Sequence, residues 1–257
     1  MASPSTSLAL TGLNALIIGG SSGIGEAIAH GYAAAGARVA IAGRVAPKLE
    51  AAAARLAARF PGTRGYVADV TDPLALAGLA ETVEQDFGQV DVLLPCQGTT
   101  IIKPTLDFTR EEFNHIVATN QTSVFFACTT FGRAMLARGS GVIVNIASLS
   151  AHRGWPRACP YAMTKHAVLA LTHTLAAEWA PQGVRVNAIS PGFFLTDLNR
   201  DKMPPERRES ALRRTPMGRF GALDELVGAA VYLASPAAGF VTGTVINVDG
   251  GYLAAGI

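Results

Sequence analysis

The stretch ALIIGGSSGIG, residues 15–25, decides the fold class of this chain. Its first four residues form a short, continuous apolar run, as expected for a strand that is buried on both faces of a sheet. A glycine-rich turn follows at once, and residues 26–35 form an alanine-rich helical segment that Gly36 ends. Strand, glycine turn and helix in this order predict a loop that cradles a pyrophosphate, because glycines allow close backbone approach and the helix start offers free N–H groups. A glycine-rich turn that binds nothing is the alternative.

Further short apolar runs alternate with helical segments along the rest of the chain. This alternation is typical of a parallel sheet that carries helices on both faces. We therefore predict a single doubly wound, Rossmann-like α/β domain over residues 1–257, with a mostly parallel sheet of seven strands. We expect residues 1–7 to form a flexible tail and residues 196–216, which are polar and follow a strand, to form a substrate lid. The strands after the first are expected at residues 38–44, 65–70, 90–94, 141–146, 184–189 and within 241–251.

Composition narrows the class of protein. Of 257 residues, 49% are hydrophobic and only 16% are charged, which fits a compact globular enzyme. The net charge of +2 gives no reason to expect nucleic acid or a membrane surface as a partner. Cys96, Cys128 and Cys159 are widely spaced, which argues against a disulfide framework or a zinc site, so we expect no metal and a cytoplasmic location. No apolar run is long enough to cross a bilayer, and the first residues lack the pattern of a signal peptide.

Two residues at helical spacing are candidates for acid–base chemistry. Tyr161 and Lys165 are four residues apart, so a helix would place them on one face. A nearby ammonium lowers the pKa of a phenol and prepares it for proton transfer. Ser148 follows the predicted strand 141–146, at the sheet edge where ligands bind in open α/β folds. A surface tyrosine and lysine and a plain loop serine are the alternatives for these residues.

The glycines at 19, 23 and 25, together with Tyr161 and Lys165, resemble the short-chain dehydrogenase/reductase family. Ser148 precedes Tyr161 by thirteen residues, as in that family, and Asn120 matches the family's helix asparagine. The resemblance implies hydride transfer between a nicotinamide and a substrate. It also implies that Ser148 polarises the substrate oxygen, that Tyr161 exchanges the proton, that Lys165 binds the nicotinamide ribose and lowers the pKa of Tyr161, and that Asn120 positions a water molecule.

The chain departs from the family in two places. Ile18 stands where most members have a structural threonine. The segment Pro95-Cys96-Gln97-Gly98 stands where the family usually has Asn-Asn-Ala-Gly, whose asparagines brace the sheet and the cofactor loop. Proline removes a backbone donor, which predicts that the strand ends there. Cys96 is expected near the cofactor pocket as a buried, inert thiol.

The end of the second strand suggests which cofactor binds. An acidic residue there would bind the adenosine ribose of NAD, whereas an arginine accommodates the 2′-phosphate of NADP. Gly43 occupies the acidic position and Arg44 follows, so we predict NADP in preference to NAD. The resemblance extends the predicted cofactor-binding set to Gly19, Ser21, Ser22, Gly23, Ile24, Gly25, Arg44, Asp69, Val70, Gly98, Tyr161, Lys165, Pro191, Gly192 and Thr196.

The segment between Ser148 and Tyr161 is rich in polar side chains, and arginine is a natural partner for a carboxylate. We therefore expect a small polar substrate, such as a sugar acid, although structural salt bridges are the alternative for Arg153 and Arg157. The segment Thr-Pro-x-Gly-Arg at residues 215–219 is shared by gluconate 5-dehydrogenases and by many ketoacyl reductases, so it does not distinguish between them. The candidate substrate residues are Ser150, His152, Arg153, Trp155 and Asn199.

The predicted function is thus an NADP-dependent oxidoreductase that interconverts a secondary alcohol and a ketone. A 3-oxoacyl-carrier-protein reductase is one alternative, and a dinucleotide-binding sensor without catalysis is another. The resemblance also implies a homotetramer, with the last strand and the apolar end, residues 252–257, packed against another subunit.

Overall fold

The computed structural model describes residues 6–196 and 203–255. Its centre is a sheet of seven strands in the order β3-β2-β1-β4-β5-β6-β7, and every neighbouring pair is parallel. The predicted Rossmann-like fold is therefore confirmed, and the sheet is wholly parallel. The strands are β1 (Asn14–Ile18), β2 (Arg38–Gly43), β3 (Arg64–Val67), β4 (Val92–Pro95), β5 (Gly141–Ile146), β6 (Val184–Pro191) and β7 (Val245–Val248).

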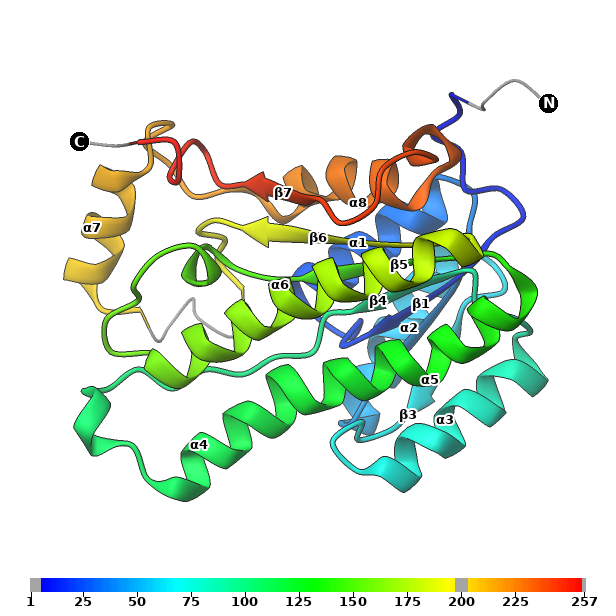
Figure 1. Ribbon diagram of the computed structural model, residues 1–257, viewed down its shortest axis with the longest axis horizontal. Coiled ribbons are helices and arrows are strands. Elements are labelled where there is room, and N and C mark those ends of the chain that lie inside the picture. The colour runs from blue at the N-terminus through cyan, green and yellow to red at the C-terminus, as the bar shows by residue number, and fades with distance from the viewer. Residues whose placement is uncertain (1–5, 197–202, 256–257) are drawn as a thin grey trace.

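Helices cover both faces of the sheet (Figure 1). One face carries α1, α2 and α8, and the other carries α3, α5 and α6. Helix α4 continues into α5 through a turn of π-helix at Ala118–Thr122, and α7 lies apart, near the C-terminal end. The helices are α1 (Gly23–Ala34), α2 (Ala46–Arg59), α3 (Pro73–Asp86), α4 (Arg110–Val117), α5 (Ser123–Arg138), α6 (Cys159–Trp179), α7 (Pro205–Arg214) and α8 (Val227–Ala234).

The apolar strands explain the two cores. Successive side chains of a strand point to opposite faces, so in β1 Leu16 and Ile18 pack on the α3–α5–α6 side, while Ala15 and Ile17 pack on the α1–α2–α8 side. All four are almost fully buried. Burial on both faces is what a continuous apolar run provides, and it fixes β1 at the centre of the sheet.

The glycine turn after β1 is held in very close contact with its surroundings. Gly19 has a φ of +80°, and a Cβ atom there would lie 2.8 Å from the backbone nitrogen of Gln97. A Cβ atom on Gly25 would lie 2.3 Å from the carbonyl oxygen of Gly19. The turn therefore requires glycine at both positions, and the close contact leaves the start of α1 facing the carboxyl ends of the strands.

Several predicted boundaries were displaced. β6 extends to Pro191, beyond the predicted residue 189, because its last residues pair with β7. β7 occupies only Val245–Val248, since pairing with β6 begins at Val245, and β3 ends at Val67 rather than at residue 70. The carbonyl of Ser7 accepts a hydrogen bond from the backbone N–H of Ala237 at 3.1 Å, so the predicted flexible tail does not include Ser7. Among the described residues, no helix is both long and apolar enough to span a membrane.

Candidate active site

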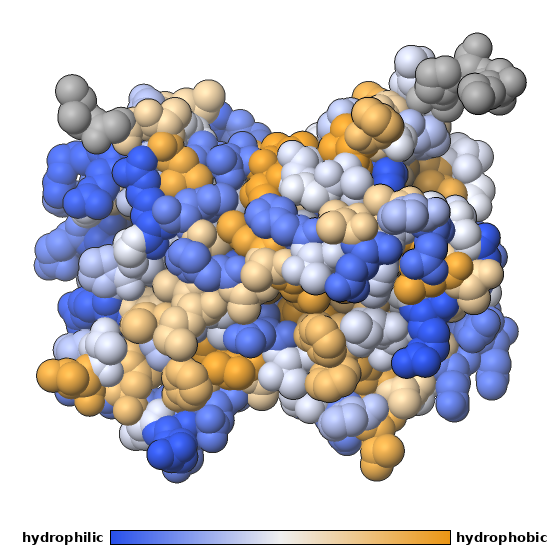
Figure 2. All heavy atoms as spheres, in the orientation of Figure 1, coloured by the Kyte–Doolittle hydropathy of each residue, from blue (hydrophilic) through white to orange (hydrophobic). Residues whose placement is uncertain are grey.

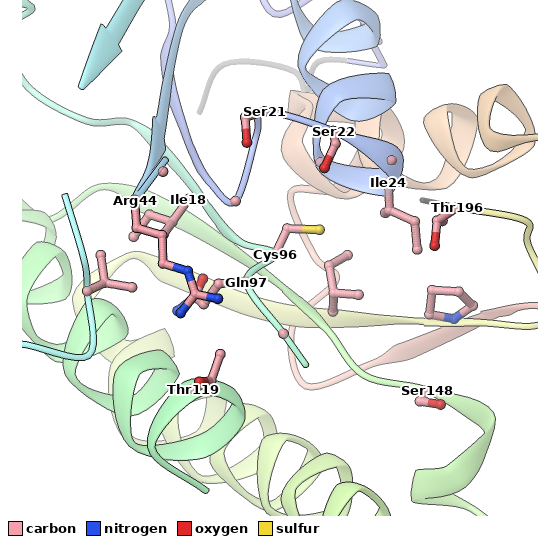
Figure 3. Close-up of a pocket in the computed structure, with 18 of the residues that line it drawn as sticks. Ile18, Ser21, Ser22, Ile24, Arg44, Cys96, Gln97, Thr119, Ser148 and Thr196 are labelled. Carbon is pink, nitrogen blue, oxygen red and sulfur yellow. The ribbon is translucent and has the colours of Figure 1, made fainter. Parts of the chain in front are cut away.

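A cleft of about 510 Å³ opens at the carboxyl ends of the strands. Every residue predicted from the sequence to bind the dinucleotide lines this cleft, and so does Ser148. Figure 3 shows Ser21, Ser22 and Ile24 of the glycine turn on one wall, with the Arg44 side chain at one end and Ser148 at the other. Segments that are far apart in the sequence therefore meet around one elongated cavity, as an extended dinucleotide requires.

Tyr161 and Lys165 face the cleft from the first turns of α6, as their spacing predicted. The Lys165 Nζ lies 5.8 Å from the centre of the Tyr161 ring and donates a hydrogen bond to the carbonyl oxygen of Ile146 at 2.8 Å. Ser148 and Tyr161 are joined by a side-chain hydrogen bond. The hydroxyl of Ser148 also accepts the backbone N–H of Ser150 at 3.2 Å, which fixes its position just beyond β5.

The electrostatics differ in one respect from the expectation. Burial raises the pKa of Tyr161, and the hydrogen bond with Ser148 works against that rise. Lys165 is not among the groups that shift the pKa of Tyr161, so the predicted lowering by Lys165 is not seen in the protein alone. Burial instead acts on Lys165 itself and lowers its pKa to about 8. The pKa values of the two groups, which are nearly equal in the free side chains, therefore move apart, because burial acts against the charged form of each: the phenolate of Tyr161 and the ammonium of Lys165.

Asn120 lies in the π-helical turn and is fully buried. Its Oδ1 accepts the backbone N–H of Thr99 at 2.7 Å, and its Nδ2 donates to the carbonyl of Thr99 at 2.8 Å and to the hydroxyl of Thr164 at 3.2 Å. Asn120 therefore ties the loop after β4 to α6, one residue before Lys165. A π-turn inside a long helix often marks a functional site, because it redirects side chains.

The unusual segment after β4 has its own bracing. β4 ends at Pro95, as predicted, and the backbone N–H of Cys96 donates to the carbonyl of Ile18 at 2.8 Å. The Gln97 Nε2 donates to the hydroxyl of Ser123 at 2.9 Å. Burial raises the pKa of Cys96 to about 12, in agreement with the inert thiol expected there. The structure thus holds this loop without the asparagines of the family pattern.

Sequence reasoning missed several residues of the cleft wall. Lys48 lines the cleft from the first turn of α2, four residues after Arg44, and no local sequence pattern marks it as a cleft residue. Thr71 donates both its backbone N–H and its hydroxyl to Asp69, which holds that carboxylate in place and lowers its pKa. Cys96, which was expected near the cofactor pocket, also lines the cleft, and the other lining residues that were not predicted are Ile18, Gly43, Val45, Ala68, Gln97, Thr119, Ile146, Ala147 and Phe194.

The candidate substrate residues have varied surroundings. Ser150 is fully buried, and the His152 Nε2 lies 2.9 Å from the Ser190 hydroxyl. The Arg153 Nη2 donates hydrogen bonds to the carbonyls of Leu253 and Ala255. Arg153 is therefore held by the C-terminal segment, whereas a structural salt bridge was the alternative from the sequence. Trp155 packs among aromatic rings beside the cleft. Asn199 lies outside the described residues. Within the described parts of the predicted lid, Pro205–Arg214 form α7.

No group of three or more His, Cys, Asp or Glu side chains suited to a metal ion occurs in residues 6–196 and 203–255. The cleft residues instead fit a nicotinamide dinucleotide. A Cβ at Gly19 or Gly25 would collide with the backbone, which leaves the turn bare for a pyrophosphate, and Arg44 and Lys48 offer cations at one end of the cleft. A Rossmann-like sheet with Ser148, Tyr161 and Lys165 at its carboxyl edge defines a dinucleotide-binding oxidoreductase.

Comparisons with known proteins agree with this class. A family model described as enoyl-(acyl carrier protein) reductase matches residues 19–253. The chain is 39% identical to gluconate 5-dehydrogenase of Gluconobacter oxydans, over 94% of this chain and 95% of the relative. It is 42% identical to galactitol 2-dehydrogenase (L-tagatose-forming) of Cereibacter sphaeroides, over 95% and 96%. The crystal structure of a gluconate 5-dehydrogenase from Burkholderia cenocepacia, in complex with NADP and tartrate, has a TM-score of 0.93 at 36% identity and covers 97% of this chain and 98% of that one. The chain belongs to the short-chain dehydrogenase/reductase family.

Replacing Lys165 by methionine is expected to stabilise the protein without cofactor at neutral pH. The side chain is 5% exposed, and its pKa falls from 10.5 to about 8 on folding. That shift corresponds to a penalty of about 3 kcal/mol for keeping the ammonium charged in the folded state. The lost hydrogen bond to Ile146 offsets about 1 kcal/mol of the gain.

The effect has a defined pH dependence. Below pH 8, Lys165 is charged in both the folded and the unfolded protein, and the full penalty applies. Between pH 8 and 10.5, Lys165 is neutral in the folded protein but still charged in the unfolded one, so the penalty shrinks as the pH rises. Urea unfolding at about pH 7 and pH 10 should therefore show the advantage of Lys165→Met shrinking. Lys48→Met, at an exposed position, is the control. An advantage that stays constant with pH would contradict the buried ammonium.

Proposed function

We propose that the protein is an NADP(H)-dependent oxidoreductase that interconverts a secondary alcohol and a ketone on a small polar substrate of the polyol or sugar-acid class. The observation that carries this proposal is the meeting of Ser148, Tyr161 and Lys165 with the glycine turn around one cleft. The bound nicotinamide would supply or accept the hydride.

The chain's own residues provide the rest of the chemistry. The Ser148 hydroxyl hydrogen-bonds Tyr161 and lies at the end of β5, where it can donate to the substrate oxygen and polarise it. The Tyr161 hydroxyl gives a proton to that oxygen in reduction and takes it back in oxidation. Lys165 places a positive charge beside the Tyr161 ring and would hydrogen-bond the ribose of the bound nicotinamide cofactor. Asn120 fixes the loop after β4 against α6, which keeps Lys165 aligned.

The preference for NADP rests on charge at one end of the cleft. Gly43 carries no carboxylate, and Arg44 and Lys48 both line the wall there. The cations Arg44, just after β2, and Lys48, on α2, with glycine in place of an acid at position 43, favour a 2′-phosphate, which a guanidinium binds through paired hydrogen bonds. The related Burkholderia cenocepacia structure contains NADP, which supports the same choice.

The substrate class rests on the relatives together with the polar loop before α6. One relative is named for gluconate, another for galactitol, and a third is the D-threitol dehydrogenase of Mycolicibacterium smegmatis at 37% identity. All three names denote polyhydroxylated compounds with secondary alcohols. A non-catalytic sensor would not need Ser148, Tyr161 and Lys165 together in the cleft, so catalysis is the better proposal.

Tyr161→Phe should abolish turnover and leave NADPH binding intact, because the ring that packs in the cleft stays and only the acidic hydroxyl is removed. NADPH absorbance would be followed with gluconate and galactitol for oxidation and their keto forms for reduction, and NADPH affinity would be measured by fluorescence. A loss of more than about 1,000-fold in kcat is expected for an essential proton donor. A kcat within tenfold of that of the parent protein would contradict the proposed role of Tyr161 in proton transfer.

Arg44→Asp should weaken NADPH binding far more than NADH binding, by roughly 100-fold or more, because it replaces an attractive charge with a repulsive one at the 2′-phosphate. Arg59→Asp makes the same charge change at the other end of α2, away from the cleft wall, and serves as the control. Titration of both cofactors gives the ratio of affinities. Equal losses for NADPH and NADH would remove the basis for the cofactor proposal.

We also propose that the protein is cytoplasmic and assembles as a homotetramer, as the family resemblance implies. The surface of α5 and α6 offers apolar contacts for such assembly, since Phe125, Phe126 and Met163 are 44%, 48% and 52% exposed. Figure 2 shows apolar side chains at the surface of this face. Light scattering should give a mass of about four chains of 26.6 kDa, and a mass of one chain would contradict the tetramer.

A further inference from the structure

A group of aromatic rings adjoins the catalytic end of the cleft. Trp155 stacks on Phe193 with ring centroids 5.8 Å apart, and Phe193 directly follows Gly192 of the cleft wall. Phe193 also contacts Tyr252 at 5.5 Å and Phe220 at 6.2 Å. We call Trp155, Phe193, Phe220 and Tyr252 the aromatic cluster. Phe193 stands between Gly192 and Phe194, which both line the cleft, so the aromatic cluster adjoins the cleft at this end.

Two guanidinium groups of α7 lie against the aromatic cluster. The Cζ of Arg207 is 5.8 Å from the centre of the Trp155 ring, and the Cζ of Arg208 is 5.7 Å from the centre of the Phe220 ring. Figure 1 shows α7 on the same side of the molecule as the loop that leads into α6 and the C-terminal end, and Figure 2 shows hydrophilic side chains there. These contacts place positive charge against the aromatic cluster, which adjoins the cleft at Gly192.

Arg207 lacks a counter-ion in the described part of the chain. Neither Arg207 nor Arg157 forms an ion pair with a carboxylate there. Burial lowers the pKa of the Arg207 guanidinium, and the positive charge of Arg157 lowers it further. A half-buried cation beside a second cation is unfavourable unless an anion joins them. The basic residues that do pair with carboxylates in the same ranges are Arg55, Lys103, Arg138, Arg213 and Arg219.

The backbone holds Arg157 in an uncommon conformation. Arg157 has a φ of +66°, the only positive φ among the described residues other than glycine, and its carbonyl accepts the N–H of Lys103 at 2.8 Å. It stands four residues before Tyr161, just ahead of α6. Non-glycine residues in this region of backbone space are uncommon and concentrate at functional sites. The neighbouring Arg153 is not available in the same way, because its guanidinium already donates to two carbonyls.

We propose that Arg207, with Arg157 beside it, binds the carboxylate of a sugar-acid substrate and thereby selects acids over neutral polyols. This inference rests on the proposed function, since it requires a substrate held against Ser148 and Tyr161. A planar guanidinium matches a carboxylate through two parallel hydrogen bonds, and partial burial strengthens them. Polyols and sugar acids share the hydroxylated chain that Ser148 and Tyr161 would engage. The carboxylate is the group that distinguishes them, so charge beside the aromatic cluster decides between the two.

The test measures binding apart from turnover. Calorimetric titration of D-gluconate would use the Tyr161→Phe protein saturated with NADPH, with Arg207→Gln, Arg157→Gln or Arg213→Gln added. Arg213 is the matched control, because it lies on the same helix and pairs only with the exposed Glu209 in the described structure. We expect Arg207→Gln to weaken gluconate binding roughly tenfold or more, the value of a charge-assisted hydrogen bond. Arg157→Gln should act in the same direction, and Arg213→Gln should change the affinity less than about twofold.

Parallel kinetics separate this inference from the proposed function. With Tyr161 intact, Arg207→Gln should raise KM for gluconate and leave the kinetics with galactitol, a neutral polyol, unchanged. Unaltered gluconate binding in Arg207→Gln would overturn the inference, and so would a parent protein that oxidises galactitol but binds no gluconate. The latter result would leave the proposed function standing. Conversely, gluconate binding that depends on Arg207 without oxidation of any polyol or sugar acid would retain the anion site and remove the proposed function.

Discussion

The buried ammonium of Lys165 is the interaction on which the site depends. An amine that is 5% exposed would lose much of its charge unless the surroundings stabilised it, and the carbonyl of Ile146 is the hydrogen-bond acceptor that the structure provides. That carbonyl belongs to the last residue of β5, and Lys165 belongs to α6. The hydrogen bond therefore fixes α6 against the end of the sheet. Tyr161, one turn earlier on α6, is placed relative to Ser148 by the same contact.

The loop after β4 shows how one function is preserved by different residues. The family pattern uses asparagines there, and this chain has Pro95, Cys96 and Gln97. The Ser123 hydroxyl donates to the carbonyl of Thr119 at 2.7 Å, so it can only accept from Gln97, and this fixes the orientation of the amide. The loop is thus tied to α5 through Gln97 and to α6 through Asn120. Bracing that was in doubt from the sequence is provided by a longer side chain one position further along.

The sequence predicted the fold well because its signals are local. A strand–turn–helix unit is predicted directly by the apolar run at residues 15–18 and the glycine turn that follows it. Alternating strands and helices along the chain permit few arrangements other than a parallel sheet. The cofactor wall was also largely predictable, since its residues follow strand ends. Lys48, Thr119 and Gln97 were not predicted as cleft residues, because each reaches the cleft only through tertiary packing. Strand ends shifted for the same reason: β7 begins where β6 offers a partner, which no local pattern encodes.

The substrate side was the least predictable part, and the structure explains why. Residues 152–157 look uniformly polar in sequence, yet their environments differ. The Arg153 guanidinium already donates hydrogen bonds to the carbonyls of Leu253 and Ala255, Trp155 packs against the rings of Phe193 and Tyr252, and the charge of Arg157 acts on Arg207 of α7. Charge in the sequence says nothing about which guanidinium is already satisfied. Hydrogen bonds to carbonyls fasten the C-terminal segment to the loop before α6, and the aromatic cluster supports α7 over that loop. Arg207 is therefore held beside the loop before α6 by contacts with neutral groups, and no carboxylate in the described part of the chain pairs with it.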